Sequence, residues 1–138
     1  MGEEMELPLV SLIVRTKDRP ALLREALQSI CEQTYPKIEI IVVNDGGDDV
    51  SEVILPFIGV NTTIVLVQFP VNLGRSKAAN AGLDKATGDY IAFLDDDDWM
   101  MPDAFHSFWE LSLQTPAAWL YGAFQFVDDA GVFLTEIA

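Results

Sequence analysis

Short hydrophobic runs alternate along the chain with longer segments whose apolar residues recur at helical spacing. The runs are rich in Val, Ile, Leu and Phe, and we expect them to form strands buried on both faces of a sheet. Four of them precede residue 95, at residues 9–14, 38–43, 63–69 and 89–94. Strands that alternate with helices are typical of right-handed βαβ units and a mostly parallel sheet.

Three helices are predicted between these strands. The first begins at Pro20, a residue suited to a first helical turn, and ends before Pro36. The second is shorter and covers roughly residues 49–57. The third, over residues 76–86, is built from alanines and Gly82, so we expect it to lie very close to the sheet.

The last part of the chain predicts one more helix and a hairpin. The helix covers residues 102–114, and residues 117–127 are expected to form a strand. Residues 128–131 then favour a turn into a final strand over 132–135. The predicted fold class is α/β: a mostly parallel central sheet flanked by helices, in a single domain over residues 1–138, with a C-terminal hairpin.

Composition limits the classes of partner. Half of the 138 residues are apolar and 22% are charged, which predicts a globular domain with a substantial core. The formal charge of −14 argues against nucleic acids and anionic membrane surfaces. We expect no membrane-spanning or targeting segment, because every apolar stretch is shorter than the ~20 residues that cross a bilayer. Cys31, the only cysteine, is expected to be a small buried side chain in a reducing, cytoplasmic compartment.

Four consecutive aspartates, Asp95 to Asp98, directly follow the fourth hydrophobic run. Two unit charges 4 Å apart repel by about 1 kcal/mol in water and about 4 kcal/mol at an effective dielectric of 20, so this run favours a counter-ion. Carboxylate oxygens suit Mg²⁺ or Mn²⁺, and one Asp-x-Asp pair is sufficient for a site shared with substrate phosphates. A solvated acidic turn is the alternative interpretation.

The other strand ends are also polar, and in an open α/β sheet all of them meet at the edge where ligands bind. The turn after the first strand, residues 15–20, lacks the glycines of a dinucleotide-binding motif, and the chain contains no Walker pattern. A metal that bridges two phosphates stabilises a departing nucleotide diphosphate. Group transfer from a nucleotide-activated donor therefore fits these residues.

An ordered series of segments resembles the inverting family 2 glycosyltransferases, which have the glycosyltransferase-A fold, a Rossmann-like nucleotide-diphospho-sugar transferase fold. Each segment is weak alone, but their succession along nearly the whole chain is specific. The segments are residues 8–14 with Thr16, then 33–36, 39–46, 72–74, 79–82, 88–95, 97–99 and 102–103.

The resemblance implies a role for each polar strand end. Thr16 and Asp18 would line the nucleotide pocket, Asp45 would accept a hydrogen bond from a uracil-like base, and Asp96 would lie near the ribose. Asp95 would belong to the same nucleotide-sugar site.

The resemblance also implies a metal element and diphosphate contacts. Asp95 and Asp97 would form the Asp-x-Asp pair, with Asp97 as the direct ligand of Mg²⁺ or Mn²⁺, and Arg75 and Lys77 would contact the diphosphate. The chain departs from the family at Ala79, where an arginine is common.

The family's acceptor-binding half, which normally carries the general base, is not matched, and we expect the chain to be truncated before it. No catalytic residue is named. His106, between two phenylalanines of a predicted helix, is expected to have a surface or packing role, and Asp128 and Asp129 are expected to form a turn.

The leading hypothesis is the donor-binding portion of a metal-dependent, inverting glycosyltransferase. Its donor would be a nucleotide-diphosphate sugar, foremost a UDP-sugar, and its acceptor an unknown saccharide, lipid or protein. Alternatives are a nucleotide-sugar-binding module or fragment without turnover, and a sugar nucleotidyltransferase. The latter would carry a glycine-rich basic loop after the first strand, and residues 16–19 do not supply one. A receiver-type domain would need an acidic pair there, where only Asp18 is found.

Overall fold

The computed structural model describes residues 6–59, 62–128 and 130–137. These form two compact units that divide between Ala104 and Phe105. The first contains β1 (Val10–Thr16), α1 (Pro20–Cys31), β2 (Ile38–Asn44), α2 (Ser51–Ile54), the 3₁₀ turn η1 (Leu55–Phe57), β3 (Thr63–Gln68), α3 (Arg75–Lys85) and β4 (Tyr90–Asp95). The helix α4 (Ala104–Ser112) begins at the boundary, and β5 (Phe124–Val127) and β6 (Phe133–Ile137) follow it in the second unit.

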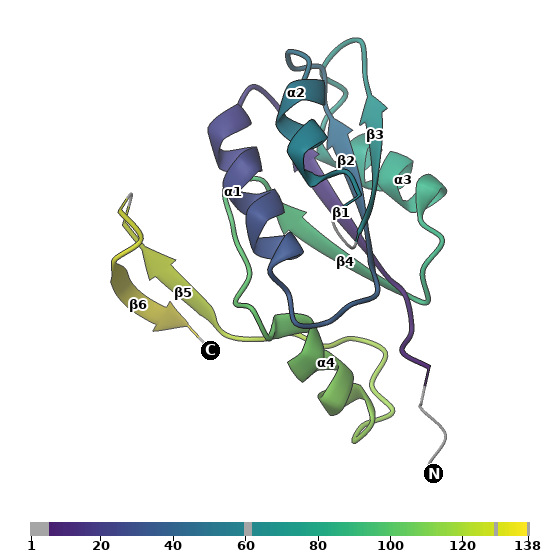
Figure 1. Ribbon diagram of the computed structural model, residues 1–138, viewed down its shortest axis with the longest axis vertical. Helices are drawn as coiled ribbons and strands as arrows, with labels where there is room; N and C mark the ends of the chain where they lie inside the picture. The colour runs from purple at the N-terminus through teal and green to yellow at the C-terminus, as the bar shows by residue number, and fades with distance from the viewer. Residues whose placement is uncertain (1–5, 60–61, 129, 138) are drawn as a thin grey trace. The chain divides into compact units, whose positions relative to one another are not determined.

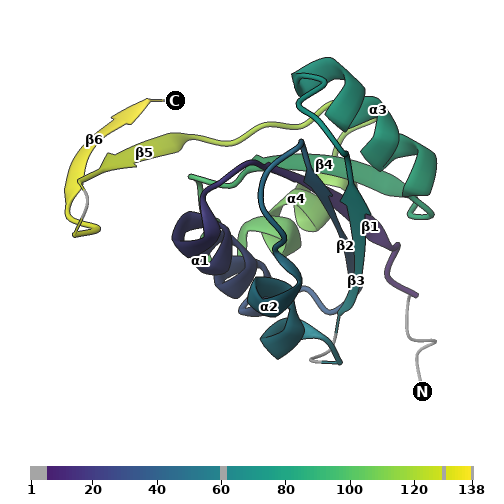
Figure 2. The ribbon, with the colours of Figure 1, turned by 90° about the horizontal axis from the view of Figure 1, so that it is seen from above.

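The four strands of the first unit form a parallel sheet in the order β3-β2-β1-β4. The chain moves from β1 outward to β2 and β3, and then returns to pair β4 with the other side of β1. Because βαβ crossovers are right-handed, this reversal places α3 on the face opposite to α1 and α2, as Figures 1 and 2 show. The reversal is a topological switch point between β1 and β4, where α/β sheets bind ligands.

The strands differ in burial, which corrects the prediction that all four are buried on both faces. All residues of β2 are buried, and so are those of β1 apart from the half-buried Arg15. The outer strands β3 and β4 are more exposed, with Ile91 at 41% and Phe93 at 55% of full exposure. The hydrophobic pattern identified the strands, but sheet order decided which of them lie at an edge.

The helix α3 lies very close to the sheet, as its small residues predict. A Cβ atom added at Gly82 would be 2.5 Å from Cγ2 of Ile13 in β1, closer than packed atoms approach. On this face the buried side chains of Ile13, Ile41 and Val43 pack with Ala78. This contact fixes the position of the first turn of α3 above the carboxyl ends of β1 and β2.

A buried carboxylate secures the turn that leads into β4. Glu39 accepts hydrogen bonds from the Ser11 hydroxyl and from both the backbone N–H and the hydroxyl of Thr87, the latter two at 2.6 and 2.8 Å. Burial alone would raise the pKa of Glu39, but the hydrogen bonds from Ser11 and Thr87 outweigh it and lower the pKa below its usual value. The ionised form is therefore the form that this turn requires.

Two predicted helices of the first unit are shorter in the structure. The first ends at Cys31, several residues before Pro36, and Cys31 is only partly buried. Burial, followed by the charge of Glu32, raises the pKa of its thiol, which disfavours the reactive thiolate. The second helix changes to a 3₁₀ turn at Leu55, because Pro56 supplies no backbone N–H to continue an α-helix.

The second unit confirms the hairpin and corrects one strand. Asp128 Oδ1 accepts hydrogen bonds from the backbone N–H groups of Ala130 and Val132, as a turn requires, while Asp129 lies outside the described residues. The strand predicted from residue 117 begins only at Phe124, because β6 is five residues long and offers no partner for a longer ladder. None of the helices in the described ranges is both long and apolar enough to cross a membrane.

Candidate nucleotide and metal site

The carboxyl ends of the four parallel strands lie along one edge of the sheet (Figure 1). At the switch point, the Thr16 hydroxyl at the end of β1 donates a hydrogen bond to Asp96 Oδ2 over 2.8 Å. Both side chains are buried, and the backbone N–H of Asp98 closes a turn on the carbonyl oxygen of Asp95. This arrangement turns Asp96 inward and leaves the neighbouring carboxylates outside.

Those neighbouring carboxylates form an exposed acidic cluster. Oxygen atoms of Asp95, Asp97 and Asp98 lie within 4.8 Å of one another. Although Asp98 is exposed, partial desolvation, followed by the charges of Asp97, Asp95 and Asp96, raises the pKa of its carboxyl, because the negative charges around it disfavour the ionised form. Three converging hard oxygen ligands suit Mg²⁺ or Mn²⁺, with room for phosphate and water at the remaining positions.

Two arginines approach the cluster, one from the turn before α1 and one from the start of α3. Arg19, just before α1, donates to Asp97 Oδ2 over 3.2 Å and lies 3.5 Å from Asp96 Oδ1. Arg75, the first residue of α3, lies 3.6 Å from Asp95 Oδ2, and its side chain is 78% exposed. Exposed pairs of this length contribute little to stability, so both guanidinium groups are available to a ligand with phosphates.

Lys77 is exposed in the first turn of α3. No salt bridge among the described residues includes Lys77, and its exposed ammonium group follows two residues after Arg75, which reaches Asp95.

Asp45, the first residue after β2, is completely buried and holds the loop before α3. Its Oδ1 accepts the Leu73 N–H at 2.7 Å, and both of its oxygens contact the Gly74 N–H. Oδ2 also accepts two hydrogen bonds from Arg15, from Nε at 3.1 Å and from Nη2 at 2.7 Å. Burial alone would raise the pKa of Asp45, but the hydrogen bonds from Leu73 and Arg15 and the Arg15 charge lower it.

The loop after Asp45 is shaped by a glycine and by Asp18. Gly46 has φ of +79°, and a Cβ there would lie 2.2 Å from the backbone nitrogen of Asn72, so only glycine fits. Asp18 Oδ1 accepts the Asp48 N–H at 2.8 Å, which joins the turns after β1 and β2. These contacts bring three strand ends together.

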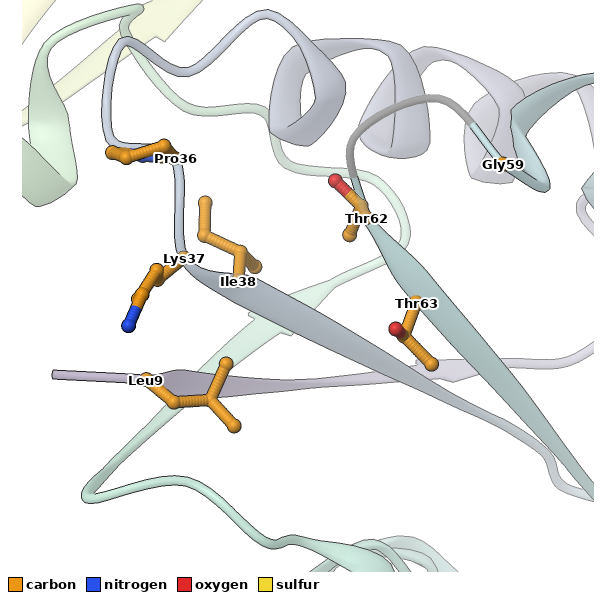
Figure 3. A pocket seen from close by; sticks show the side chains of 7 residues that line it. All are labelled: Leu9, Pro36, Lys37, Ile38, Gly59, Thr62 and Thr63. Carbon is orange, nitrogen blue, oxygen red and sulfur yellow. The ribbon is translucent and has the colours of Figure 1, made fainter. Parts of the chain in front are cut away.

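The other end of the sheet, at the amino termini of its strands, has a hollow but, among the described residues, no cluster of charged side chains. A pocket of about 480 Å³ lies at the amino ends of β1, β2 and β3 (Figure 3), lined by Leu9, Pro36, Lys37, Ile38, Gly59, Thr62 and Thr63. Its lining includes no carboxylate, and Lys37 pairs with Glu6 at 3.3 Å. The grouped acids and arginines, rather than this hollow, mark the candidate site.

The structure brings four of the eight predicted site residues together in two pairs. Thr16 contacts Asp96, and Arg75 contacts Asp95. Asp18 faces the turn after β2, and Lys77 stands apart from these contacts. Sequence reasoning overlooked Arg15 and Arg19, and it gave Asp98 no role of its own within the aspartate run. The run Arg15-Thr16-Lys17-Asp18-Arg19 at a strand end was the available signal, since it holds three of the eight basic residues.

His106 has the surface role that its position suggested. Its Nε2 lies 3.1 Å from Glu110 Oε1, one turn along α4, and both side chains are about half exposed or more.

Solved structures with a similar fold are glycosyltransferases of the glycosyltransferase-A class. One is the crystal structure of S. aureus TarS 1–349 in complex with UDP-GlcNAc, at TM-score 0.69 and 25% identity, covering 77% of this chain and 31% of that one. Another is the mannosyltransferase PcManGT from Pyrobaculum calidifontis in complex with GDP-Man and Mn²⁺, at TM-score 0.62 and 30% identity, covering 67% and 28%.

Sequence comparison identifies the family. Residues 11–136 match the family model of glycosyl transferase family 2, and the chain belongs to that family. An uncharacterized glycosyltransferase of Haemophilus influenzae is 35% identical over 128 residues, which are 92% of this chain and 51% of the relative. The chain thus spans about half the length of that curated relative.

Proposed function

We propose that this chain is the donor-binding portion of a glycosyltransferase that passes a sugar from a nucleotide-diphosphate sugar to an acceptor hydroxyl, with inversion. The acidic cluster of Asp95, Asp97 and Asp98 at the switch point carries the proposal. Support comes from TarS and PcManGT, whose solved complexes hold UDP-GlcNAc and GDP-Man with Mn²⁺. We propose a UDP-sugar as the first candidate donor.

The metal ligands in this proposal are Asp95 and Asp97, with Asp98 within reach of the same ion. Mg²⁺ or Mn²⁺, when bound, supplies positive charge to the diphosphate. Arg75 and Lys77 add fixed charges on the α3 side, where they orient the diphosphate and stabilise it as it leaves.

The nucleoside would lie along the edge formed by Thr16, Asp18, Asp45 and Asp96. Asp96, held by the Thr16 hydroxyl, would face the ribose, while the turn joined by Asp18 would enclose the nucleoside. No residue of this chain is assigned as the general base, which an acceptor-binding segment would supply.

Thermal denaturation with UDP, GDP, CDP and ADP, each with Mn²⁺ and with EDTA, tests the proposal. A nucleotide at about 100 times its dissociation constant stabilises the folded state by roughly 2.7 kcal/mol. We expect UDP with Mn²⁺ to raise the melting temperature, and EDTA to remove most of the increase. If every nucleotide leaves the melting temperature unchanged under both conditions, the proposed donor site is wrong.

A second candidate is nucleotide-sugar binding without turnover. It needs only the acidic cluster and the strand-end contacts described above, and none of those residues is assigned as a general base. Release of UDP from a UDP-sugar distinguishes the two candidates: binding without release over hours, with and without simple sugar acceptors, favours the binding module.

A further inference from the structure

The buried carboxylate of Asp45 has no hydrogen-bonding capacity left for a ligand. An ionised carboxylate offers about four lone-pair sites. Asp45 contacts the N–H groups of Leu73 and Gly74 and two N–H groups of Arg15, and its side chain is fully buried. A base that presents its own N–H at this point would meet an acceptor that is already occupied.

Arg15, in contrast, has donors to spare. Its guanidinium carries five N–H groups, of which one on Nε and one on Nη2 are used by Asp45. No other acceptor in the described parts of the chain bonds to the remaining three, and 27% of the side chain is open to solvent. In the parallel pair of β1 and β4, Arg15 lies opposite Asp95 of the acidic cluster. It directly precedes Thr16 at the switch point.

We propose that Arg15 selects the nucleobase of the donor by donating hydrogen bonds to a keto oxygen, such as O4 of uracil or O6 of guanine. The inference rests on the proposed function, since it needs a nucleotide at this edge. Cytosine and adenine present an amino group at the equivalent position, which would place donor against donor. Asp45 is then a positioning residue that holds the guanidinium in one orientation.

The competing explanation is that Arg15 and Asp45 form a purely structural ion pair that orders the loop before α3. Loss of Arg15 would then weaken the binding of every nucleotide by the same factor. Base selection instead changes the ratio of affinities between two nucleotides that differ only at the edge of the base. UDP and CDP are such a pair, because they share the ribose and the diphosphate.

Isothermal titration of UDP and CDP in Mn²⁺ separates these explanations. We expect the wild-type chain to bind UDP at least tenfold more tightly than CDP, and Arg15→Leu to bring the ratio close to one. Arg15→Lys keeps a positive charge beside the buried Asp45 and is the variant to use if Arg15→Leu does not fold; it should reduce the ratio severalfold. Arg24→Leu, which removes an exposed arginine of α1, should leave it unchanged.

Each other result has a definite meaning. A UDP to CDP ratio that stays the same in Arg15→Leu or Arg15→Lys, with both affinities reduced equally, overturns base selection and leaves the proposed function intact. A wild-type ratio near one does the same. If the wild-type chain binds neither nucleotide, nor GDP, the proposed function fails and this inference fails with it.

Discussion

The hydroxyl of Thr16 donates to a carboxylate oxygen of Asp96 over 2.8 Å, and both side chains are buried. This contact joins the last residue of β1 to the turn after β4, across the point where the strand order reverses. Because Asp96 turns inward to meet Thr16, the acids on either side of it turn outward. One hydrogen bond thus separates the buried Asp96 from the three aspartates that form the exposed cluster.

Loss of this hydrogen bond should destabilise the first unit. Thr16→Val preserves shape but leaves the buried Asp96 without its donor, so we expect the free energy of unfolding to fall by about 1–3 kcal/mol. Urea denaturation of Thr16→Val, Asp96→Asn and the double variant forms a cycle with a coupling energy of about 1 kcal/mol. Purely additive effects would show that the two side chains do not stabilise each other.

Acid should weaken the fold through Glu39. The pKa of Glu39 is lowered in the folded state, so at pH values around the usual glutamate pKa of ~4.3 the unfolded chain binds more protons than the folded chain. The stabilisation is complete above that value and is lost as the pH falls through the lower, folded-state pKa. Urea denaturation at several pH values from 6 to 3 should show this decline, and Glu39→Gln should flatten it. An identical decline in the variant would assign the pH dependence elsewhere, with Asp45 the next candidate.

The close approach of α3 to the sheet makes Gly82→Ala a sensitive test of the packing. Alanine favours a helix, but its Cβ would lie 2.5 Å from a side-chain carbon of Ile13. Overpacking typically costs about 1–3 kcal/mol and should exceed the gain of roughly 1 kcal/mol in helix propensity. Thermal denaturation should therefore show a lower melting temperature for Gly82→Ala, while Asn80→Ala on an exposed position of α3 should not lower it. A more stable Gly82→Ala would contradict the packing described.

Sequence patterns predicted the strands and helices well because hydrophobic periodicity is a local property. They did not identify β3 and β4 as exposed edge strands, since an edge depends on which strands become neighbours. The same reason applies to the second unit, where the strand from residue 117 was expected but only Phe124–Val127 found a partner.

The candidate site was predictable in composition but not in connectivity. The run predicted an acidic cluster, and the family resemblance singled out Asp95 and Asp97 within it. The burial of Asp96 and the exposure of Asp98 depend on the direction in which each side chain leaves the turn. The pair of Arg15 and Asp45 joins residues 30 positions apart through sheet geometry. The sequence around each residue does not indicate that all hydrogen-bonding sites of Asp45 are occupied while Arg15 keeps unused donors.

Asp97 should be the most sensitive position for metal affinity. Asp97→Asn removes one charge and one strong oxygen ligand. Because substitution of residues that only orient a metal ligand already lowers metal affinity by about tenfold or more, we expect Mn²⁺ affinity in the presence of UDP to fall by at least that factor. Calorimetric titration of Mn²⁺ measures this directly. The matched control is Asp84→Asn, which removes an exposed carboxylate of α3. An equal loss of Mn²⁺ affinity in both variants would show that the change in net charge, and not the loss of a metal ligand, causes it.

The position of the metal and nucleotide is the central claim, and paramagnetic broadening by Mn²⁺ tests it most directly. With UDP present and Mn²⁺ added in small amounts, amide resonances of residues 95–98 and 73–75 should broaden first. Those of Lys37 and Thr63, beside the pocket at the opposite edge of the sheet, should remain sharp. Broadening that begins at Lys37 and Thr63, or that spreads evenly over the acidic surface, would contradict a donor site at the switch point.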